Sequence, residues 1–199
     1  MSAHAEASHA GHPPVAHQSS RVDARTLGMF LFIASEIMLF GSFFTAYFFV
    51  RVVNGVDWPP AGSHLPVFVA GVNTCVLVTS SFTIHWALQS IKRGNHAGLK
   101  AGLLLTVCLG LVFLLTQVRE YSRIGFAPHD NSFGTIFYGL TGLHGAHVFV
   151  GLCLLSMATI RAFRGHFSPD HHHGVEIPGI YWHFVDVMWI VVYTTIYIL

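Results

Sequence analysis

The segment LGMFLFIASEIMLFGSFFTAYFFV, residues 27–50, determines the fold class of this chain. Its only charged residue is Glu36. A helix that crosses the roughly 30 Å hydrocarbon core of a bilayer needs about 20 mostly apolar residues, because each residue advances the helix by about 1.5 Å. Backbone groups in lipid find hydrogen-bond partners only within such a helix. We therefore expect residues 27–50 to form a transmembrane helix.

Four further apolar stretches follow, and we expect each of them to cross the membrane. The connections between the stretches are short, which favours antiparallel packing of sequential helices in one bundle. The predicted fold is therefore all-α, a polytopic membrane protein with a bundle of five transmembrane helices. The further stretches cover residues 65–91, 101–118, 131–160 and 177–199.

The composition agrees with a membrane protein and excludes a nucleic-acid partner. Of 199 residues, 53% are hydrophobic and 10% are charged, against about 25% charged in ordinary soluble domains. The formal net charge of +1 provides no basic surface for a row of phosphates. Residues 1–25 are rich in Ala, His, Ser and Pro without apolar periodicity, so we expect a disordered leader before a membrane domain at 26–199.

The basic residues predict the orientation in the membrane. Seven of the ten lie at the end of the predicted helices that carries the N-terminus, and three lie at the other end. The positive-inside rule then places the N-terminus and the leader in the cytoplasm and residue 199 outside. The first set is Arg21, Arg25, Lys92, Arg93, Lys100, Arg161 and Arg164, and the second is Arg51, Arg119 and Arg123.

Two carboxylates lie within the apolar stretches. Glu36 and Asp186 each cost about 2.5 to 3.5 kcal/mol at the centre of a membrane helix. Each is the tenth residue of its predicted helix, so both lie about 14 Å from the inner end. A proton relay or ion site is one interpretation. Interhelical hydrogen bonding is favoured, because no further charged group continues a path across the membrane.

Histidines are the natural partners of these carboxylates. His183 precedes Asp186 by three residues and so shares its helix face, where the imidazole can donate to the carboxylate. By depth, His147 and His183 are the nearest candidate histidines for the two carboxylates. Together with His85 and His144, these histidines raise a haem or metal interpretation. Their estimated depths range from roughly 9 to 24 Å, which favours hydrogen-bonded core groups instead.

Several small and aromatic residues have structural interpretations. We expect the three cysteines to be core residues, and the glycines of YGLTGLHGAHVFVG, residues 138–151, to allow close approach of a neighbouring helix. Four aromatic residues of the last helix are interpreted as interface belts and packing. The cluster at residues 171–173 is interpreted as a hydrated loop rather than a surface metal site. The glycines are Gly139, Gly142 and Gly145, and the aromatic residues are Trp182, Trp189, Tyr193 and Tyr197.

Five motifs carry a resemblance to a known family. They keep their order along residues 29–199, and YWHFVDVMWIVVY inside a membrane helix is the most specific. The chain resembles subunit III of the haem-copper respiratory oxidases, a family of cytochrome c and quinol oxidases. The motifs are ASEIMLFGSFFTAYF at 34–48, REY at 119–121, TGLHGAHVFVG at 141–151, FSPDHHHGVE at 167–176 and YWHFVDVMWIVVY at 181–193.

The resemblance implies a subunit without haem, copper or catalytic residues of its own. Such a subunit packs against subunit I, which reduces oxygen and pumps protons, and supports its proton uptake while holding membrane phospholipids. It implies other oxidase subunits as partners, haem and copper in those partners, and a bacterial cytoplasmic membrane for a five-helix form. Arg161 matches a residue associated with lipid headgroups, and Arg164 lies beside it. The other matching residues are Glu36, Glu120, His144, His147 and Asp186.

Other classes of function remain open from the sequence. A five-helix proton or ion transporter would use Glu36 and Asp186 as carrier groups. A haem-binding oxidoreductase would use the four membrane histidines. A relative of this family also accompanies nitric oxide reductase. The proteins that copurify with the chain would distinguish these alternatives.

Overall fold

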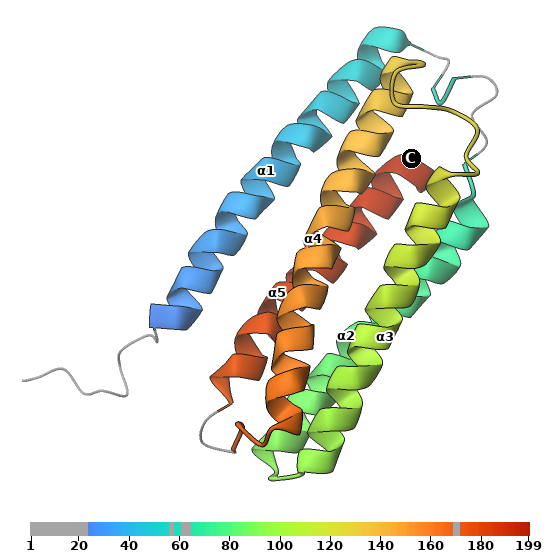
Figure 1. The fold of residues 1–199 in the computed structure, drawn as a ribbon. Helices are drawn as coiled ribbons and strands as arrows, with labels where there is room; N and C mark the ends of the chain where they lie inside the picture. The colour runs from blue at the N-terminus through green and yellow to red at the C-terminus, as the bar shows by residue number, and fades with distance from the viewer. Residues whose placement is uncertain (1–23, 56–57, 61–64, 169–171) are drawn as a thin grey trace, which may run out of the picture.

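Five long helices make up the part of the chain that the computed structural model describes, which is residues 24–55, 58–60, 65–168 and 172–199. Each is long and apolar enough to cross a membrane. The predicted all-α fold with five candidate membrane spans is confirmed (Figure 1). The helices are α1 (Ala24–Asn54), α2 (Val67–Lys92), α3 (His96–Tyr121), α4 (Ser132–Phe163) and α5 (His173–Tyr193), and α5 continues as a π-helix, η2 (Thr194–Ile198).

Helices α1, α3 and α4 are longer than the apolar stretches that predict them, with 31, 26 and 32 residues. The prediction 101–118 is too short for α3, because the Asn95 side chain caps the helix by accepting a hydrogen bond from the Gly98 backbone N–H at 3.0 Å. Helix α5 begins four residues before the predicted start and includes Pro178. Helix α1 begins at Ala24, so the last two residues of the predicted leader are helical. The remainder of the leader lies outside the described residues.

Helix α1 packs against α4 and α5 (Figure 1). The expectation that sequential helices are neighbours is therefore wrong for α1 and α2, although it holds for the rest of the chain. The described residue Trp58, which follows α1, contacts the beginning of α4. There Trp58 packs on Phe133 with ring centroids 5.1 Å apart and donates to the Tyr47 hydroxyl at 3.1 Å.

The closest helix pair is α2 and α3. A Cβ added at Gly102 of α3 would lie 2.7 Å from Ala87 Cβ of α2. The sequence instead predicted close approach at the α4 glycines. At Gly142 and Gly145 an added Cβ would meet nothing within 4 Å, and at Gly139 it would meet only the Phe43 ring. That prediction is wrong for Gly142 and Gly145, and at Gly139 the neighbouring atoms belong to the Phe43 side chain of α1 rather than to a helix backbone.

Two tryptophans of α5 occupy the centre of the bundle. Trp182 and Trp189 are fully buried, and their indole N–H groups donate to Ser80 Oγ at 2.8 Å and Thr74 Oγ1 at 2.9 Å of α2. The belt interpretation is wrong for both, because hydroxyl groups of α2 satisfy the polar edge of each ring inside the bundle. Tyr197 is also buried, with its ring 6.1 Å from that of Phe137.

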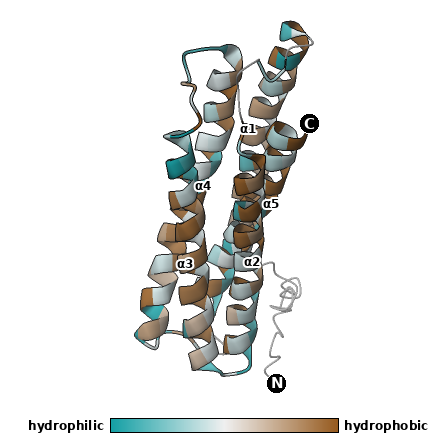
Figure 2. Ribbon diagram, turned by 90° about the vertical axis from the view of Figure 1, so that its right-hand side faces the viewer, coloured by the Kyte–Doolittle hydropathy of each residue, from teal (hydrophilic) through white to brown (hydrophobic). Residues whose placement is uncertain are grey.

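The outer surface of the bundle is apolar. Met38, Val52 and Phe68 are 78%, 79% and 83% exposed, and hydrophobic colour covers most of the middle of the helices (Figure 2). The three cysteines, Cys75, Cys108 and Cys153, also face outward. Their predicted core position is wrong, because a small apolar side chain needs no burial when the surroundings are lipid.

Candidate functional site

Glu36 of α1 lies against His147 of α4. Glu36 Oε2 is 2.9 Å from His147 Nε2, and the two side chains are only 15% and 12% exposed. The ring of Phe40 covers the imidazole at a centroid distance of 5.0 Å. The structure therefore pairs Glu36 with one of the two candidate histidines, at the contact between α1 and α4.

The hydrogen bonds of His147 define how the pair shares its protons. His147 Nδ1 lies 2.8 Å from the Leu143 carbonyl oxygen, which only accepts, so Nδ1 carries a proton. Nε2 then either accepts from a protonated Glu36 or donates to its carboxylate. In both forms the pair carries no net charge, which reduces the cost of placing it within a membrane.

Asp186 of α5 belongs to a second cluster, formed with α2. The Ser81 hydroxyl donates to Asp186 Oδ2, and Ser81 Oγ also lies 2.9 Å from His183 Nδ1. The sequence predicted a direct bond between His183 and Asp186. The structure places the Ser81 hydroxyl between them, and Asp186 Oδ1 is buried without a partner among the described residues.

Ser81 is the residue that sequence reasoning missed. A serine in an apolar helix commonly bonds to its own backbone, as Ser80 does to the Leu77 carbonyl oxygen at 2.6 Å. The available signal was the depth of Ser81, near the middle of its predicted helix and close to that of Asp186. Hydroxyl groups at the depth of a buried carboxylate are candidate partners in a helix bundle.

His144 and Glu120 belong to neither cluster. His144 is fully buried, and neither ring nitrogen has a hydrogen-bond partner in the described structure. Its ring instead packs against Trp189 and Phe113, at centroid distances of 4.8 and 5.8 Å. Glu120 lies in the last turn of α3, partly buried. The residue after it, Tyr121, donates to Thr141 Oγ1 at 2.8 Å.

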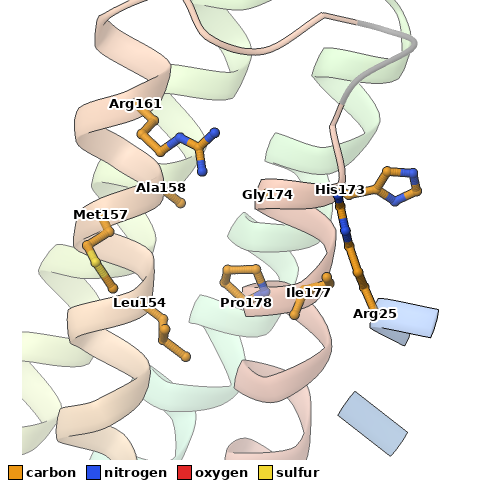
Figure 3. Close-up of a pocket in the computed structure, with 9 residues that line it drawn as sticks. All are labelled: Arg25, Leu154, Met157, Ala158, Arg161, His173, Gly174, Ile177 and Pro178. Atoms are coloured by element: carbon orange, nitrogen blue, oxygen red, sulfur yellow. The ribbon is translucent and has the colours of Figure 1, made fainter. Parts of the chain in front are cut away.

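A basic pocket lies between the ends of α1, α4 and α5. It has a volume of about 340 Å³, and Arg25, Arg161 and His173 are among its lining residues. Arg161 extends from α4 toward the start of α5 (Figure 3). Its guanidinium lies 5.5 Å from the centroid of the Phe167 ring. Arg164 ends α4 as its C-cap and does not line this pocket.

The membrane histidines are divided among different contacts. His147 belongs to the Glu36 pair, His183 to the Asp186 cluster, and His85 lies on the outer face of α2. Among the described residues, no group of three or more His, Cys, Asp or Glu side chains could hold a metal ion. Of the loop cluster, His172 stacks on His173 at 5.9 Å, whereas residue 171 lies outside the described residues.

These features define a polytopic helical membrane protein whose buried polar groups join neighbouring helices. The family model of cytochrome c oxidase subunit III matches residues 4–199. The chain therefore belongs to the cytochrome c oxidase subunit III family. As a member, it is a subunit of a haem-copper oxidase in a respiratory chain.

Relatives from distant organisms agree with this assignment. A cytochrome c oxidase subunit 3 of Thermostichus vulcanus is 41% identical over 93% of this chain and 92% of its own length. That of Drosophila yakuba is 42% identical over 85% of this chain and 67% of its own length. That of Loxodonta africana is 40% identical over 94% of this chain and 72% of its own length.

Proposed function

We propose that the chain is a supporting subunit of the oxidase, without a redox centre or a step of the pumped proton's path of its own. The main support is that its two buried carboxylates belong to separate clusters. Glu36 joins α1 to α4, and Asp186 joins α5 to α2. No hydrogen bond between described residues links the two clusters. Each cluster has the form of an interhelical contact rather than a segment of a proton path.

The proposed main partner is subunit I, the subunit that reduces oxygen and takes up protons. Haem and copper then belong to partner subunits, and other oxidase subunits complete the assembly. Cytochrome c is the proposed electron donor, because the relatives are named cytochrome c oxidase subunit 3. A bundle whose surface is mostly apolar suits a multi-pass protein surrounded by lipid and by other membrane subunits.

The Glu36→Gln variant of the assembled oxidase tests this role. Glutamine keeps the shape of the side chain and can hydrogen-bond His147, so we expect normal assembly, oxygen reduction and numbers of protons pumped per electron. Ser35→Ala is the matched control, because the Ser35 hydroxyl bonds to the Phe32 carbonyl oxygen of its own helix at 2.7 Å. A well-assembled Glu36→Gln oxidase that no longer pumps protons would place Glu36 on the pathway.

The basic pocket is the proposed site for phospholipid headgroups. Guanidinium groups bind phosphate through paired hydrogen bonds, and Arg161 and Arg25 line the pocket with His173. Arg164 then contributes charge near the site rather than a contact in it. Native mass spectrometry of the Arg161→Leu oxidase tests the site, because bound anionic phospholipid should decrease while it stays unchanged in Arg164→Leu.

The proposed location is the bacterial cytoplasmic membrane, with the N-terminus inside. The ends of α2 and α4 and the beginning of α3 carry most of the basic residues of the described chain. These ends lie together at one end of the bundle (Figure 1). Basic residues accumulate on the cytoplasmic side of bacterial membrane proteins.

A further inference from the structure

A row of polar side chains lies along the outer side of the contact between α2 and α5. Ser81, His85 and Gln89 are four residues apart and therefore share one side of α2, and His85 Nε2 lies 3.5 Å from Gln89 Nε2. From α5, His183 reaches Ser81 at 2.9 Å. His85 is exposed, whereas Ser81 and His183 are partly buried. The row therefore opens to the surroundings of the bundle.

The row lies at the depth of the hydrocarbon core. Helix α2 has 26 residues, a length of about 39 Å, which exceeds the roughly 30 Å of hydrocarbon. Ser81 lies near its middle, and His85 lies about 10 Å from its end at Lys92. Lipid tails offer no hydrogen bonds, so an imidazole facing them carries a cost that a polar protein partner removes.

The same contact continues toward the other end of α2 as an apolar groove. The groove has a volume of about 630 Å³. Gly71 lines it without a side chain, and a Cβ added there would lie 3.1 Å from the Tyr193 hydroxyl oxygen. From Gly71 to Gln89 the surface extends about 27 Å, close to the thickness of the hydrocarbon core. We name this surface the α2–α5 seam, defined by Val67, Phe68, Gly71, Val72, Cys75, Ser81, His85, Gln89, His183 and Tyr193.

We propose that the α2–α5 seam docks one transmembrane helix of another oxidase subunit. This inference rests on the proposed function, because it names the surface through which the chain joins a partner. The partner helix is apolar where it faces the groove at Gly71 and carries hydrogen-bonding side chains where it faces His85 and His183. An acyl chain would fill the apolar half and would offer no hydrogen bond to either imidazole.

The hydrogen bonds at His183 specify what the partner must offer. The Ser81 hydroxyl donates its proton to Asp186, so it accepts from His183 Nδ1. The remaining ring nitrogen, Nε2, is then an acceptor in the neutral imidazole. A Ser, Thr, Asn or Trp side chain of the partner helix supplies the matching donor.

Photo-crosslinking in the intact oxidase tests the docking. We place p-benzoylphenylalanine at His85 and, separately, at Val72, with Leu115 of α3 as the control because it is 66% exposed outside the seam. Both seam positions should crosslink to the same transmembrane helix of another oxidase subunit, and position 115 should not. In an intact oxidase, the docking proposal would be overturned, but not the proposed function, by adducts with lipid only, with a second copy of this chain or with the chain's own residues. A chain that purifies without any oxidase subunit would overturn the proposed function as well.

A substitution at His85 measures whether the polar half of the seam helps to hold the chain in the oxidase. His85→Leu should lower retention of the chain in detergent-challenged oxidase by about threefold, the effect of one average interhelical hydrogen bond in a membrane. His85→Gln should restore most of it, and Leu115→Ala should leave it unchanged. Equal retention of His85→Leu and Leu115→Ala would contradict the proposal.

Discussion

The packing of Trp182 gives the sharpest prediction for the bundle. Its indole ring lies between Gly110 of α3 and Gly151 of α4. A Cβ added at Gly151 would lie 2.8 Å from Trp182 Cε3, and one added at Gly110 would lie 2.6 Å from Trp182 Cη2. Because the ring contacts both glycines and its N–H is held by Ser80, it has no free direction in which to move. We therefore expect Gly151→Ala to destabilise the bundle.

The size of the effect follows from two opposing contributions. Overpacking a close-packed site lowers the free energy of unfolding by about 1 to 3 kcal/mol. Replacing glycine by alanine in a helix raises it by up to about 1 kcal/mol. The expected net loss is about 1 to 2 kcal/mol, or roughly 2 to 8 °C in the unfolding midpoint of a chain of this size. Thermal unfolding of the detergent-solubilised protein, followed by size-exclusion chromatography, measures it.

Gly145→Ala is the matched control on the same helix. An added Cβ at Gly145 meets nothing within 4 Å, so this variant should unfold at the wild-type temperature or slightly above. Trp182→Phe removes the part of the ring nearest Gly151, so Gly151→Ala should cost much less in that background, a coupling of about 0.5 to 3 kcal/mol. Equal midpoints for Gly151→Ala and Gly145→Ala would refute the reasoning.

The remaining predictions concern the two carboxylate clusters and the topology. His147→Ala leaves Glu36 buried without its partner and should lower stability by about 1 to 3 kcal/mol in thermal unfolding, more than Glu36→Gln does; equal effects would show that the hydrogen bond is unimportant. Asp186→Ala removes the carboxylate that accepts from the Ser81 hydroxyl and should weaken assembly by about 1 to 3 kcal/mol, whereas Asp186→Asn should lose less; retention on size-exclusion chromatography compares them. Cysteines introduced at Asn95 and His129 should react with impermeant reagents from the cytoplasmic and the outer side respectively, and the reverse pattern would invert the orientation.

The helices were predictable because each apolar stretch is long enough to cross a membrane and is bounded by polar residues. The side of each helix that faces the interior of the bundle was not predictable. Apolar side chains cover both the outer and the inner faces, so the sequence does not distinguish the buried Trp182 from the exposed Cys75. In water the hydrophobic pattern separates the two faces of a helix, and in lipid that separation is lost.

The candidate site was predictable only where the depth of a residue in the membrane is enough to identify its hydrogen-bond partner. His147 was one of two candidate histidines by depth, and it bonds to Glu36 because the structure places α1 and α4 side by side. The position of Ser81 between Asp186 and His183 depends on the contact of α2 with α5. These helices are far apart in the sequence, so their contact had no local signal.

The composition of the complex that contains this chain tests the central claim most directly. The chain should be purified after extraction in a mild detergent, with its partners identified by mass spectrometry and its haem measured by difference spectroscopy. We predict a stoichiometric complex with the oxygen-reducing subunit, and haem that remains with that subunit when this chain is removed. A chain that purifies free of oxidase subunits, or that itself retains stoichiometric haem, would contradict the account.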